Sequence, residues 1–244
     1  MKNLNYQNKD ISNYFSKNRI KFSDFYRSEK KIILKHIKNN KNIFDIGCGC
    51  GGLGLALQEK FKNIHYEGIE MNKYAARYGI KNFAGKNLTI YNNDFLKFNV
   101  LKELKFKSYD YIFSLSCIDW QYNFHKSFIK AINLLNKSSK LIISLRLTKK
   151  SSINDINNSF QYINYSNLKK GDRAPYVVLN ALEFIDFIDA NNIHINDLYG
   201  YYGLPSKTAV TPFKKIFFVV AVLKLGKKPI IKNLMKLTNN FYNK

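Results

Sequence analysis

The chain has 244 residues, 45% of them hydrophobic, and its 40 basic against 17 acidic side chains give a formal charge of +23. This length suits one α/β domain with a sizeable core and is short for two, and the even spread of apolar residues excludes a disordered chain. The longest apolar run, residues 216–223, is too short for a membrane-spanning helix, which needs about twenty residues, so we expect a soluble protein.

The three cysteines, Cys48, Cys50 and Cys117, are too few for a disulfide framework, which favours the reducing cytoplasm. A Cys-x-Cys pair cannot complete a tetrahedral zinc site, and no histidine-rich segment lies near it in the sequence. We therefore expect no metal site.

The positive charge has two interpretations. Only five of the 40 basic residues are arginine, the residue best suited to phosphate and base recognition. The abundance of Lys, Asn and Ile also matches what an AT-rich genome encodes. The charge is therefore either a solvated basic surface or a mark of an anionic partner, namely RNA or, through the basic tail at 226–244, a membrane surface.

The first part of the chain alternates between strand and helix patterns. Residues 1–40 form an N-terminal cap that reads as helical from residue 10, and polar Asn39 and Asn40 end it. Short apolar strands are predicted at 42–46, 64–70, 88–91, 109–114 and 140–146, with helices at 53–61, 73–83 and 124–135. This alternation predicts an α/β fold with a parallel sheet covered on both faces.

The rhythm breaks at residues 147–176, which are polar and read as an insertion suited to binding a substrate. A helix is predicted at 177–191, and two strands, at 193–202 and 215–224, form a long hairpin around Pro205 and Pro212. No repeat or linker divides the sequence, so residues 1–244 are expected to form one domain.

The segment from Asp45 to Gly51 joins the first strand to a helix and is rich in glycine. Gly47, Gly49 and Gly52 fit the pattern G-x-G-x-x-G, so the loop alone is compatible with S-adenosylmethionine (SAM) or with NAD. In open parallel sheets, ligands bind beyond the carboxyl ends of the strands. The sequence therefore places a nucleotide-like cofactor at this loop.

Polar side chains also follow the next strands. Glu70 ends the second strand, where a carboxylate can accept both hydroxyls of a ribose. Asp94 follows the third strand and can accept the amino group of adenine, while Phe95 can cover the ring. Residues 114–120 follow the fourth strand, where a methyl donor and its acceptor would meet.

Residues 40–146 resemble the SAM-binding core of class I methyltransferases. The resemblance rests on Asp45 two residues before Gly47, on Asp94, and on the late strand pair. It implies a Rossmann-like, doubly wound, mostly parallel seven-stranded sheet with an antiparallel last strand. It also implies a set of cofactor contacts: Asp45, Gly47, Cys48, Gly49, Glu70, Met71, Asp94, Phe95 and Ser114.

The motif after the fourth strand lacks the Asn/Asp-Pro-Pro-Tyr of enzymes that methylate adenine or glutamine amino groups and the Pro-Cys of cytosine-C5 enzymes. Several short strings are similar to those of bacterial methyltransferases that modify sugars of surface polysaccharides. The resemblance implies O-methylation of a sugar or other small hydroxyl compound. It implies these substrate contacts: Tyr26, Arg27, Glu29, Trp120, Arg146, Gln161, Tyr162 and Tyr176.

A general base helps methyl transfer to a hydroxyl that is not acidic. Asp119 and His125 follow the fourth strand and are the candidate catalytic residues. Three other functions stay open: an RNA methyltransferase that uses the basic surface, a non-catalytic SAM-binding regulatory protein, and an NAD-dependent oxidoreductase.

Overall fold

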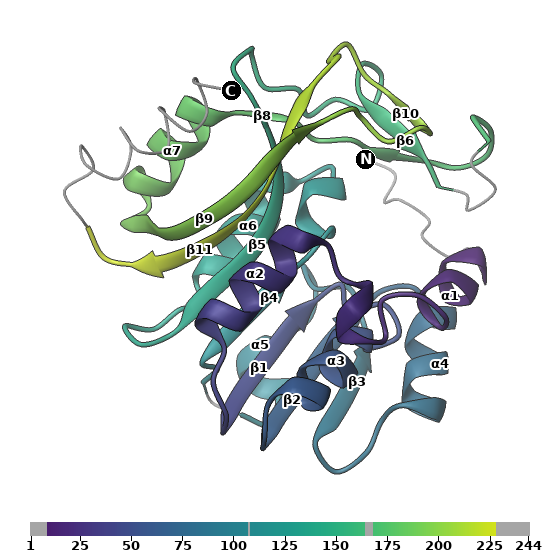
Figure 1. Ribbon diagram of the computed structural model, residues 1–244, viewed down its shortest axis with the longest axis vertical. Coiled ribbons are helices and arrows are strands. Elements are labelled where there is room, and N and C mark those ends of the chain that lie inside the picture. Colours follow the sequence, from purple (N-terminus) through teal and green to yellow (C-terminus); the bar gives the residue numbers. More distant parts are fainter. Residues whose placement is uncertain (1–8, 107, 164–167, 228–244) are drawn as a thin grey trace.

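The computed structural model describes residues 9–106, 108–163 and 168–227. Its main sheet has the strand order β3-β2-β1-β4-β5-β11-β9, and the short β8 (Leu179–Asn180) pairs with the end of β5 (Figure 1). The seven strands are β1 (Lys41–Ile46), β2 (Ile64–Glu70), β3 (Leu88–Asn92), β4 (Tyr111–Ser114), β5 (Lys140–Thr148), β9 (Ile193–Gly203) and β11 (Ile216–Leu225). Strands β1 to β5 are parallel, and β11 runs antiparallel to both β5 and β9. The predicted mostly parallel seven-stranded sheet with its antiparallel last strand is confirmed.

Helices cover both faces of this sheet, so its central strands are apolar on both sides. Successive residues of one strand point to opposite faces, and Ile43 and Phe44 accordingly belong to two different core clusters. One cluster holds residues of α2 (Arg27–His36), α3 (Gly52–Lys60) and α4 (Lys73–Asn82). The other holds residues of α5 (Val100–Glu103), α6 (Phe124–Ile132) and α7 (Ala181–Ala190).

The N-terminal cap is not one continuous helix. It consists of α1 (Lys9–Phe15), a 3-10 turn (Phe22–Asp24) and α2. Arg19 lies between them with a left-handed φ of 61°, and the Asp24 carboxylate accepts hydrogen bonds from the N–H groups of Ile20 and Lys21. The chain therefore doubles back between α1 and α2.

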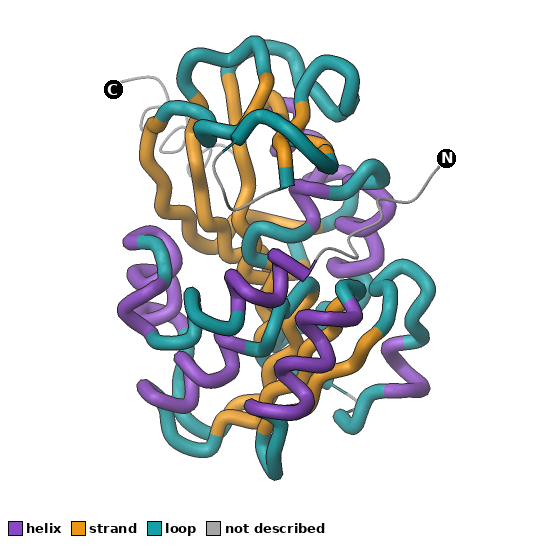
Figure 2. The backbone as a smooth tube through the Cα atoms, turned by 90° about the vertical axis from the view of Figure 1, so that its right-hand side faces the viewer, coloured by secondary structure: helices purple, strands orange, loops and turns teal. Residues whose placement is uncertain are grey.

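The predicted insertion at 147–176 contributes to a second, three-stranded sheet. Here β6 (Phe160–Tyr162) pairs with β7 (Arg173–Pro175) on one side and with β10 (Ala209–Val210) on the other. This small sheet lies with the loops at one end of the molecule, above the carboxyl ends of the main strands (Figures 1 and 2). Helix α7 begins after Asn180, whose side chain caps it by accepting hydrogen bonds from the N–H groups of Leu182 and Glu183. The helix predicted at 177–191 therefore starts later than expected.

Most of the predicted basic tail, from residue 228 onward, lies outside the described residues. Among the helices of the described part, none has the length and apolar character needed to cross a bilayer.

At Gly79, inside α4, we expect alanine to destabilise the protein, which is the opposite of its usual effect in a helix. Glycine to alanine normally stabilises a helix interior by up to about 1 kcal/mol. At Gly79, however, a Cβ would lie 2.4 Å from the Cys50 carbonyl oxygen in the glycine loop. We expect Gly79→Ala to lower the free energy of unfolding by about 1–3 kcal/mol in urea titrations. The matched control is Gly85→Ala, whose Cβ would meet nothing within 4 Å; equal effects of the two would contradict this packing.

Candidate active site

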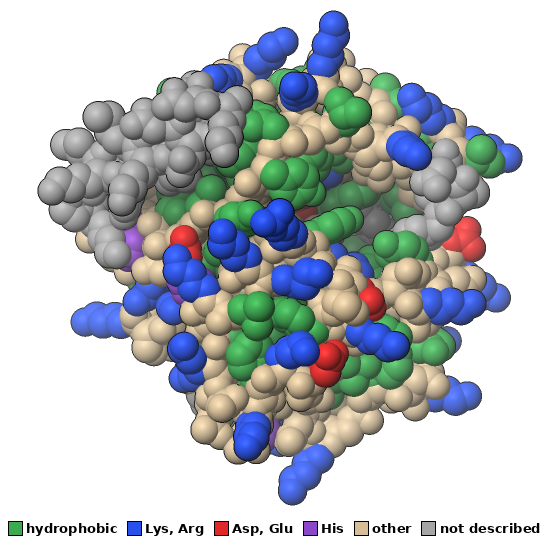
Figure 3. Space-filling view, in the orientation of Figure 1, with side chains coloured by type: hydrophobic (Ala, Val, Ile, Leu, Met, Phe, Trp, Pro, Cys, Tyr) green, Lys and Arg blue, Asp and Glu red, His purple; other side chains and the backbone are tan. Residues whose placement is uncertain are grey.

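A cavity of about 520 Å³ opens at the carboxyl ends of β1, β2 and β4, between α1 and the small sheet. Figure 3 shows the surface hollowed in this region. Its polar and aromatic lining includes Tyr14, Arg19, Tyr26, Asp45, Glu70, Asn93, Asp94, Phe95, Trp120, Gln121, Gln161, Tyr162, Ser206 and Thr208. The cavity therefore gathers side chains from both ends of the sequence at the edge where ligands of such sheets bind.

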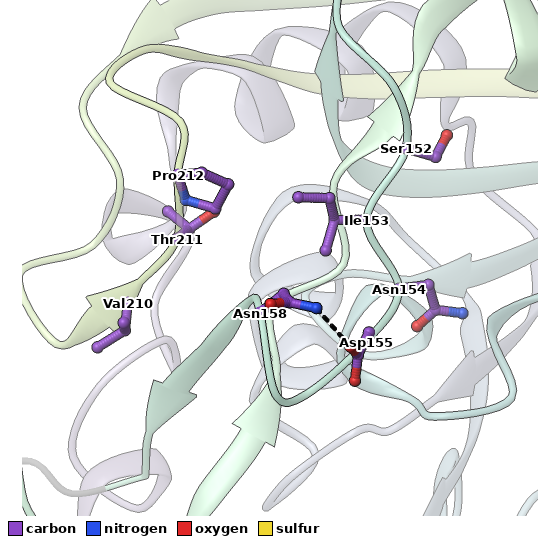
Figure 4. A pocket seen from close by; sticks show the side chains of 8 residues that line it. All are labelled: Ser152, Ile153, Asn154, Asp155, Asn158, Val210, Thr211 and Pro212. Atoms are coloured by element: carbon purple, nitrogen blue, oxygen red, sulfur yellow. Dashed lines mark hydrogen bonds between the residues drawn. The ribbon is translucent and has the colours of Figure 1, made fainter.

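A second hollow of about 530 Å³ lies among loop residues 152–158 and 210–212 (Figure 4). It shares no lining residue with the first. Its carboxylate, Asp155, accepts a hydrogen bond from Asn158 at 2.7 Å. Because the first cavity, unlike the second, is lined by residues at the carboxyl ends of β1 and β2, we take the first cavity as the site.

The glycine loop turns sharply beneath this cavity. Gly47, Gly49 and Gly51 have φ values of 75°, 57° and 84°, a region that favours glycine. A Cβ on Gly47 would lie 2.3 Å from Sγ of Cys117, and one on Gly49 would lie 3.2 Å from the Phe15 ring. Because these glycines have no side chain, the loop after β4 and helix α1 can pack closely against the glycine loop.

Two of the carboxylates that line the cavity, Asp45 and Glu70, lie beside the glycine loop. Asp45 is buried and accepts a hydrogen bond from the Tyr66 hydroxyl at 2.5 Å, and its burial raises its pKa from 3.8 to about 7. Glu70 accepts from the N–H of Gly49 at 2.9 Å and of Asn72 at 2.7 Å, and burial raises its pKa as well. Each carboxylate oxygen has two lone pairs, so Glu70 keeps capacity for the two hydroxyls of a ribose.

The remaining predicted cofactor residues divide into two groups. Met71, Asp94 and Phe95 line the cavity together with Gly47 and Cys48; Oδ1 of Asp94 accepts from the Leu96 N–H at 2.9 Å. Ser114 instead is fully buried outside the lining, where its Oγ accepts from the Ile118 N–H at 3.3 Å. Gly49 is also outside the lining but contributes the N–H that holds Glu70.

Arg19 is a site residue that the sequence reasoning missed. It is the only Lys or Arg among the described residues lining the cavity. Its guanidinium forms a two-point ion pair with the buried Glu29, at 2.9 and 3.1 Å, and lies over the Phe25 ring at 4.4 Å. Glu29, a predicted substrate contact, is therefore outside the lining and fixes Arg19. Only the scarcity of arginine in the sequence could have singled this residue out.

The predicted acceptor residues Tyr26, Trp120, Gln161 and Tyr162 also line the cavity, and we call these four residues its acceptor end. The amide nitrogen of Gln161 donates to the hydroxyls of Ser206 and Thr208, each at 2.9 Å. Its carbonyl oxygen Oε1 is buried and has no hydrogen-bond partner within the described part of the chain. An unsatisfied buried carbonyl at a cavity wall is suited to accept a hydrogen bond from a ligand.

The other predicted residues lie outside the lining. Arg146 is buried, pairs with Asp119 at 2.8 Å and lies 3.8 Å from the centre of the Tyr176 ring. Burial raises the pKa of Asp119, although Arg146 opposes the rise. His125 is exposed on α6, with its ring 4.9 Å from that of Phe187. These positions do not favour Asp119 or His125 as a base at the cavity.

Arg27 is exposed at the first position of α2. No group of three or more His, Cys, Asp or Glu side chains that could hold a metal ion occurs within the described ranges.

A family model described as a methyltransferase domain matches residues 37–192. The chain belongs to this methyltransferase family. A putative methyltransferase, 235L, of Invertebrate iridescent virus 6 is 26% identical over 200 residues, which cover 78% of this chain and 68% of the viral protein. The (S)-tetrahydroprotoberberine N-methyltransferase of Eschscholzia californica is 35% identical over 107 residues, but the match spans only 30% of that enzyme.

Solved methyltransferases share the fold. A putative S-adenosylmethionine-dependent methyltransferase from Listeria monocytogenes superposes with a TM-score of 0.58 at 13% identity, over 82% of this chain and 99% of that one. The 1,6-didemethyltoxoflavin-N1-methyltransferase of Burkholderia thailandensis, which holds S-adenosylhomocysteine (SAH), has a TM-score of 0.56 at 12% identity, over 82% of this chain and 78% of that one. Family, fold and site chemistry together make SAM the cofactor of this methyltransferase.

The raised pKa of Asp45 predicts how stability depends on pH. Between about pH 4 and pH 7 the folded state keeps a proton that the unfolded state has lost, so stability falls as the pH rises through this window. Asp45→Asn keeps an acceptor for Tyr66 and removes this titration. We expect it to raise the free energy of unfolding at pH 8 by about 2–4 kcal/mol and to change it little at pH 4.

Urea unfolding at both pH values measures the difference. The control is Asp186→Asn on the exposed side of α7, which should shift stability by less than about 0.5 kcal/mol at either pH. A pH-independent effect of Asp45→Asn would contradict the raised pKa.

The Arg146–Asp119 pair predicts a structural rather than a catalytic phenotype. Arg146→Met leaves the Asp119 carboxylate buried without its cation, so we expect a loss of about 3–5 kcal/mol in the free energy of unfolding. The double variant Arg146→Met/Asp119→Leu removes both charges and should recover most of that loss. Denaturant titrations of the parent and three variants form the cycle; additive losses would contradict a direct interaction.

Proposed function

We propose that this methyltransferase transfers the methyl group of SAM to a hydroxyl of a small polar acceptor whose reacting unit is uncharged, most simply a sugar used in surface polysaccharide biosynthesis. The observation that carries the proposal is the distribution of charge along the cavity. Its four ionisable Asp, Glu and Arg side chains, Arg19, Asp45, Glu70 and Asp94, all accompany the glycine loop or the strand ends that suit the cofactor. The residues assigned to the acceptor, Tyr26, Trp120, Gln161 and Tyr162, contribute only aromatic, amide and hydroxyl groups, and the Arg19 guanidinium lies 5.4 Å from the centre of the Tyr26 ring.

The cofactor end matches the parts of SAM one by one. The Arg19 guanidinium suits the carboxylate of the methionine portion, and the Asp45 carboxyl lies beside the glycine loop, suited to its amino group. Glu70 suits the ribose hydroxyls, while Asp94 with Phe95 suits the adenine.

The acceptor end matches a saccharide. The rings of Tyr26, Trp120 and Tyr162 offer flat apolar surfaces on which a pyranose can stack, and the free carbonyl of Gln161 can accept a hydrogen bond from a hydroxyl. Ser206 and Thr208 hold the amide nitrogen of Gln161, so its carbonyl points in a fixed direction.

Bound SAM supplies an electrophilic methyl group on a sulfonium sulfur. The acceptor oxygen forms a bond to this carbon as the sulfur–carbon bond breaks, SAH leaves, and the hydroxyl proton passes to water. The chain contributes mainly by holding the acceptor in line, because no His or Lys lines the described part of the cavity. A hydrogen bond from the hydroxyl to Gln161 would direct its lone pair toward the methyl group.

Methylation of an amine, which binds as a cation and loses its proton before it reacts, is the first rival, since N-methyltransferases are among the similar proteins. An amine cation would be expected to meet a carboxylate, and the acceptor end has none. RNA methylation remains the second rival and draws its support from the net charge of +23.

The test uses the single tryptophan of the chain, Trp120, whose fluorescence reports directly on the cavity. SAH at 100 times its dissociation constant should stabilise the protein by about 2.7 kcal/mol, and Glu70→Gln should abolish most of this shift. With labelled SAM, we expect methyl incorporation into neutral saccharides rather than into amines or RNA.

Gln161→Leu tests the acceptor end separately. We expect it to raise the KM for the saccharide about tenfold, through loss of a hydrogen bond worth about 1–2 kcal/mol, and to leave SAH binding unchanged. Asn154→Leu, outside the cavity lining, serves as the control. Incorporation only into an amine or RNA would overturn the acceptor class, and the absence of any SAH shift would overturn the cofactor assignment.

A further inference from the structure

A row of basic side chains runs along α2, away from the cavity mouth. Arg27, Lys31 and Lys35 recur every four residues on α2 and share one exposed face, and the exposed Lys38 follows two residues after the end of the helix. We call these four residues the basic stripe. Tyr26, which lines the cavity and is 57% exposed, directly precedes it. Figure 3 shows basic side chains gathered over α2.

The basic stripe has little internal compensation. Among the described residues, one ion pair involves the basic stripe, between Lys35 and Asp197 at 2.7 Å. The one acidic residue of α2, Glu29, is turned inward to Arg19. Like charges four residues apart destabilise a helix, and a cation in the first turn opposes the helix dipole, as Arg27 does.

Lysines outside the basic stripe add to the positive electrostatic potential on this side of the molecule. Burial lowers the pKa of Lys140, and repulsion from Lys224, Lys38 and Lys41 lowers it further. Lys41 has a partner in Asp110 at 2.8 Å. The positive potential of the stripe thus continues along this side of the molecule, where it would be relieved by bound anionic groups.

Aromatic side chains of β9 flank the stripe. Lys31 lies over the Tyr199 ring at 4.1 Å, and Tyr201, 45% exposed, stacks on Phe218 with ring centres 5.6 Å apart. Because Tyr199 and Tyr201 are two residues apart on one strand, they share a face. The two tyrosines therefore offer surfaces for stacking beside the cations of the basic stripe.

We propose that the basic stripe and these two tyrosines bind an acidic saccharide chain, with carboxylate or phosphate groups on its sugars, whose end unit enters the cavity as the methyl acceptor. The inference rests on the proposed function and deepens it. The acceptor end of the cavity would receive the reacting hydroxyl, and the stripe would hold the charged sugars that follow. Three of the four cations are lysines, which act as point charges and suit carboxylates without the planar recognition that arginine gives to bases.

The experiment measures binding rather than methyl transfer. A fluorescent oligogalacturonate, a chain of uronic acid sugars, is titrated against the full chain at two salt concentrations, beside a neutral dextran oligosaccharide and a poly(U) RNA of matched length. The stripe variant is Arg27→Gln/Lys31→Gln/Lys38→Gln, which spares Lys35 because it pairs with Asp197. The control is Lys86→Gln/Lys126→Gln/Lys137→Gln, three exposed lysines elsewhere with the same change of charge.

We expect oligogalacturonate to bind more tightly than dextran, with affinity that falls as salt rises, and the stripe variant to lose about tenfold in affinity. The control variant should lose less than about twofold. Equal loss in both variants would mean unspecific attraction and would overturn the proposal, as would binding of poly(U) alone or of neither polymer. The SAH thermal shift verifies that each variant is folded.

The two proposals can fail separately. Methylation of neutral saccharides without any stripe-dependent binding would overturn only the inference about the stripe. Stripe-dependent binding with no methyl incorporation into any saccharide would overturn the proposed acceptor instead.

Discussion

The Glu70 carboxylate fixes the floor of the site. One oxygen accepts the Gly49 N–H of the loop after β1, and the other accepts the Asn72 N–H at the start of α4. Asn72 in turn caps α4 through the N–H groups of Tyr74 and Ala75. One side chain thereby ties the glycine loop, the end of β2 and a helix together. A carboxylate that would hold the ribose is thus already oriented by backbone groups, so little reorganisation is needed on binding.

The roof of the cavity comes from segments that are distant in the sequence. Ile11 of α1 packs with Cys50 of the glycine loop and Ala75 of α4, and Ile163 after β6 lies against the same small cluster. The Ser12 hydroxyl also donates to the Tyr74 carbonyl. The cap and the small sheet therefore meet over the cofactor end through apolar contacts. Charged contacts that such apolar packing shields from water are stronger than the same contacts in bulk solvent.

The sequence predicted the sheet well because its signals are local. Alternation of apolar strands and amphipathic helices located all seven main strands, and the loop glycines marked the cofactor end. The short strands β6, β7 and β10 were not predicted, since two or three residues leave no periodic pattern and β10 pairs with β6 across nearly fifty positions of the sequence. The same holds for Arg19, which only the left-handed turn before α2 brings to the cavity.

The predicted base residues illustrate a further limit. Proximity in sequence to the end of β4 placed Asp119 and His125 near the reaction centre, but the direction of a side chain depends on the packing of its neighbours. Asp119 turns toward Arg146, which also donates to the carbonyls of Asp119 and Val177. His125 turns outward to Phe187.

The distribution of charge links stability to function in this protein. The chain retains a buried Asp45 whose raised pKa costs stability near neutral pH, and it retains like charges along α2 that cost helix stability. Neither is needed to build the sheet, because the surrounding positions are already filled by apolar packing. Charges that destabilise the free protein but face the cavity or its mouth are best explained by ligands that compensate them. We propose that this ligand is the cofactor at Asp45 and the charged sugars of an acidic saccharide chain along α2.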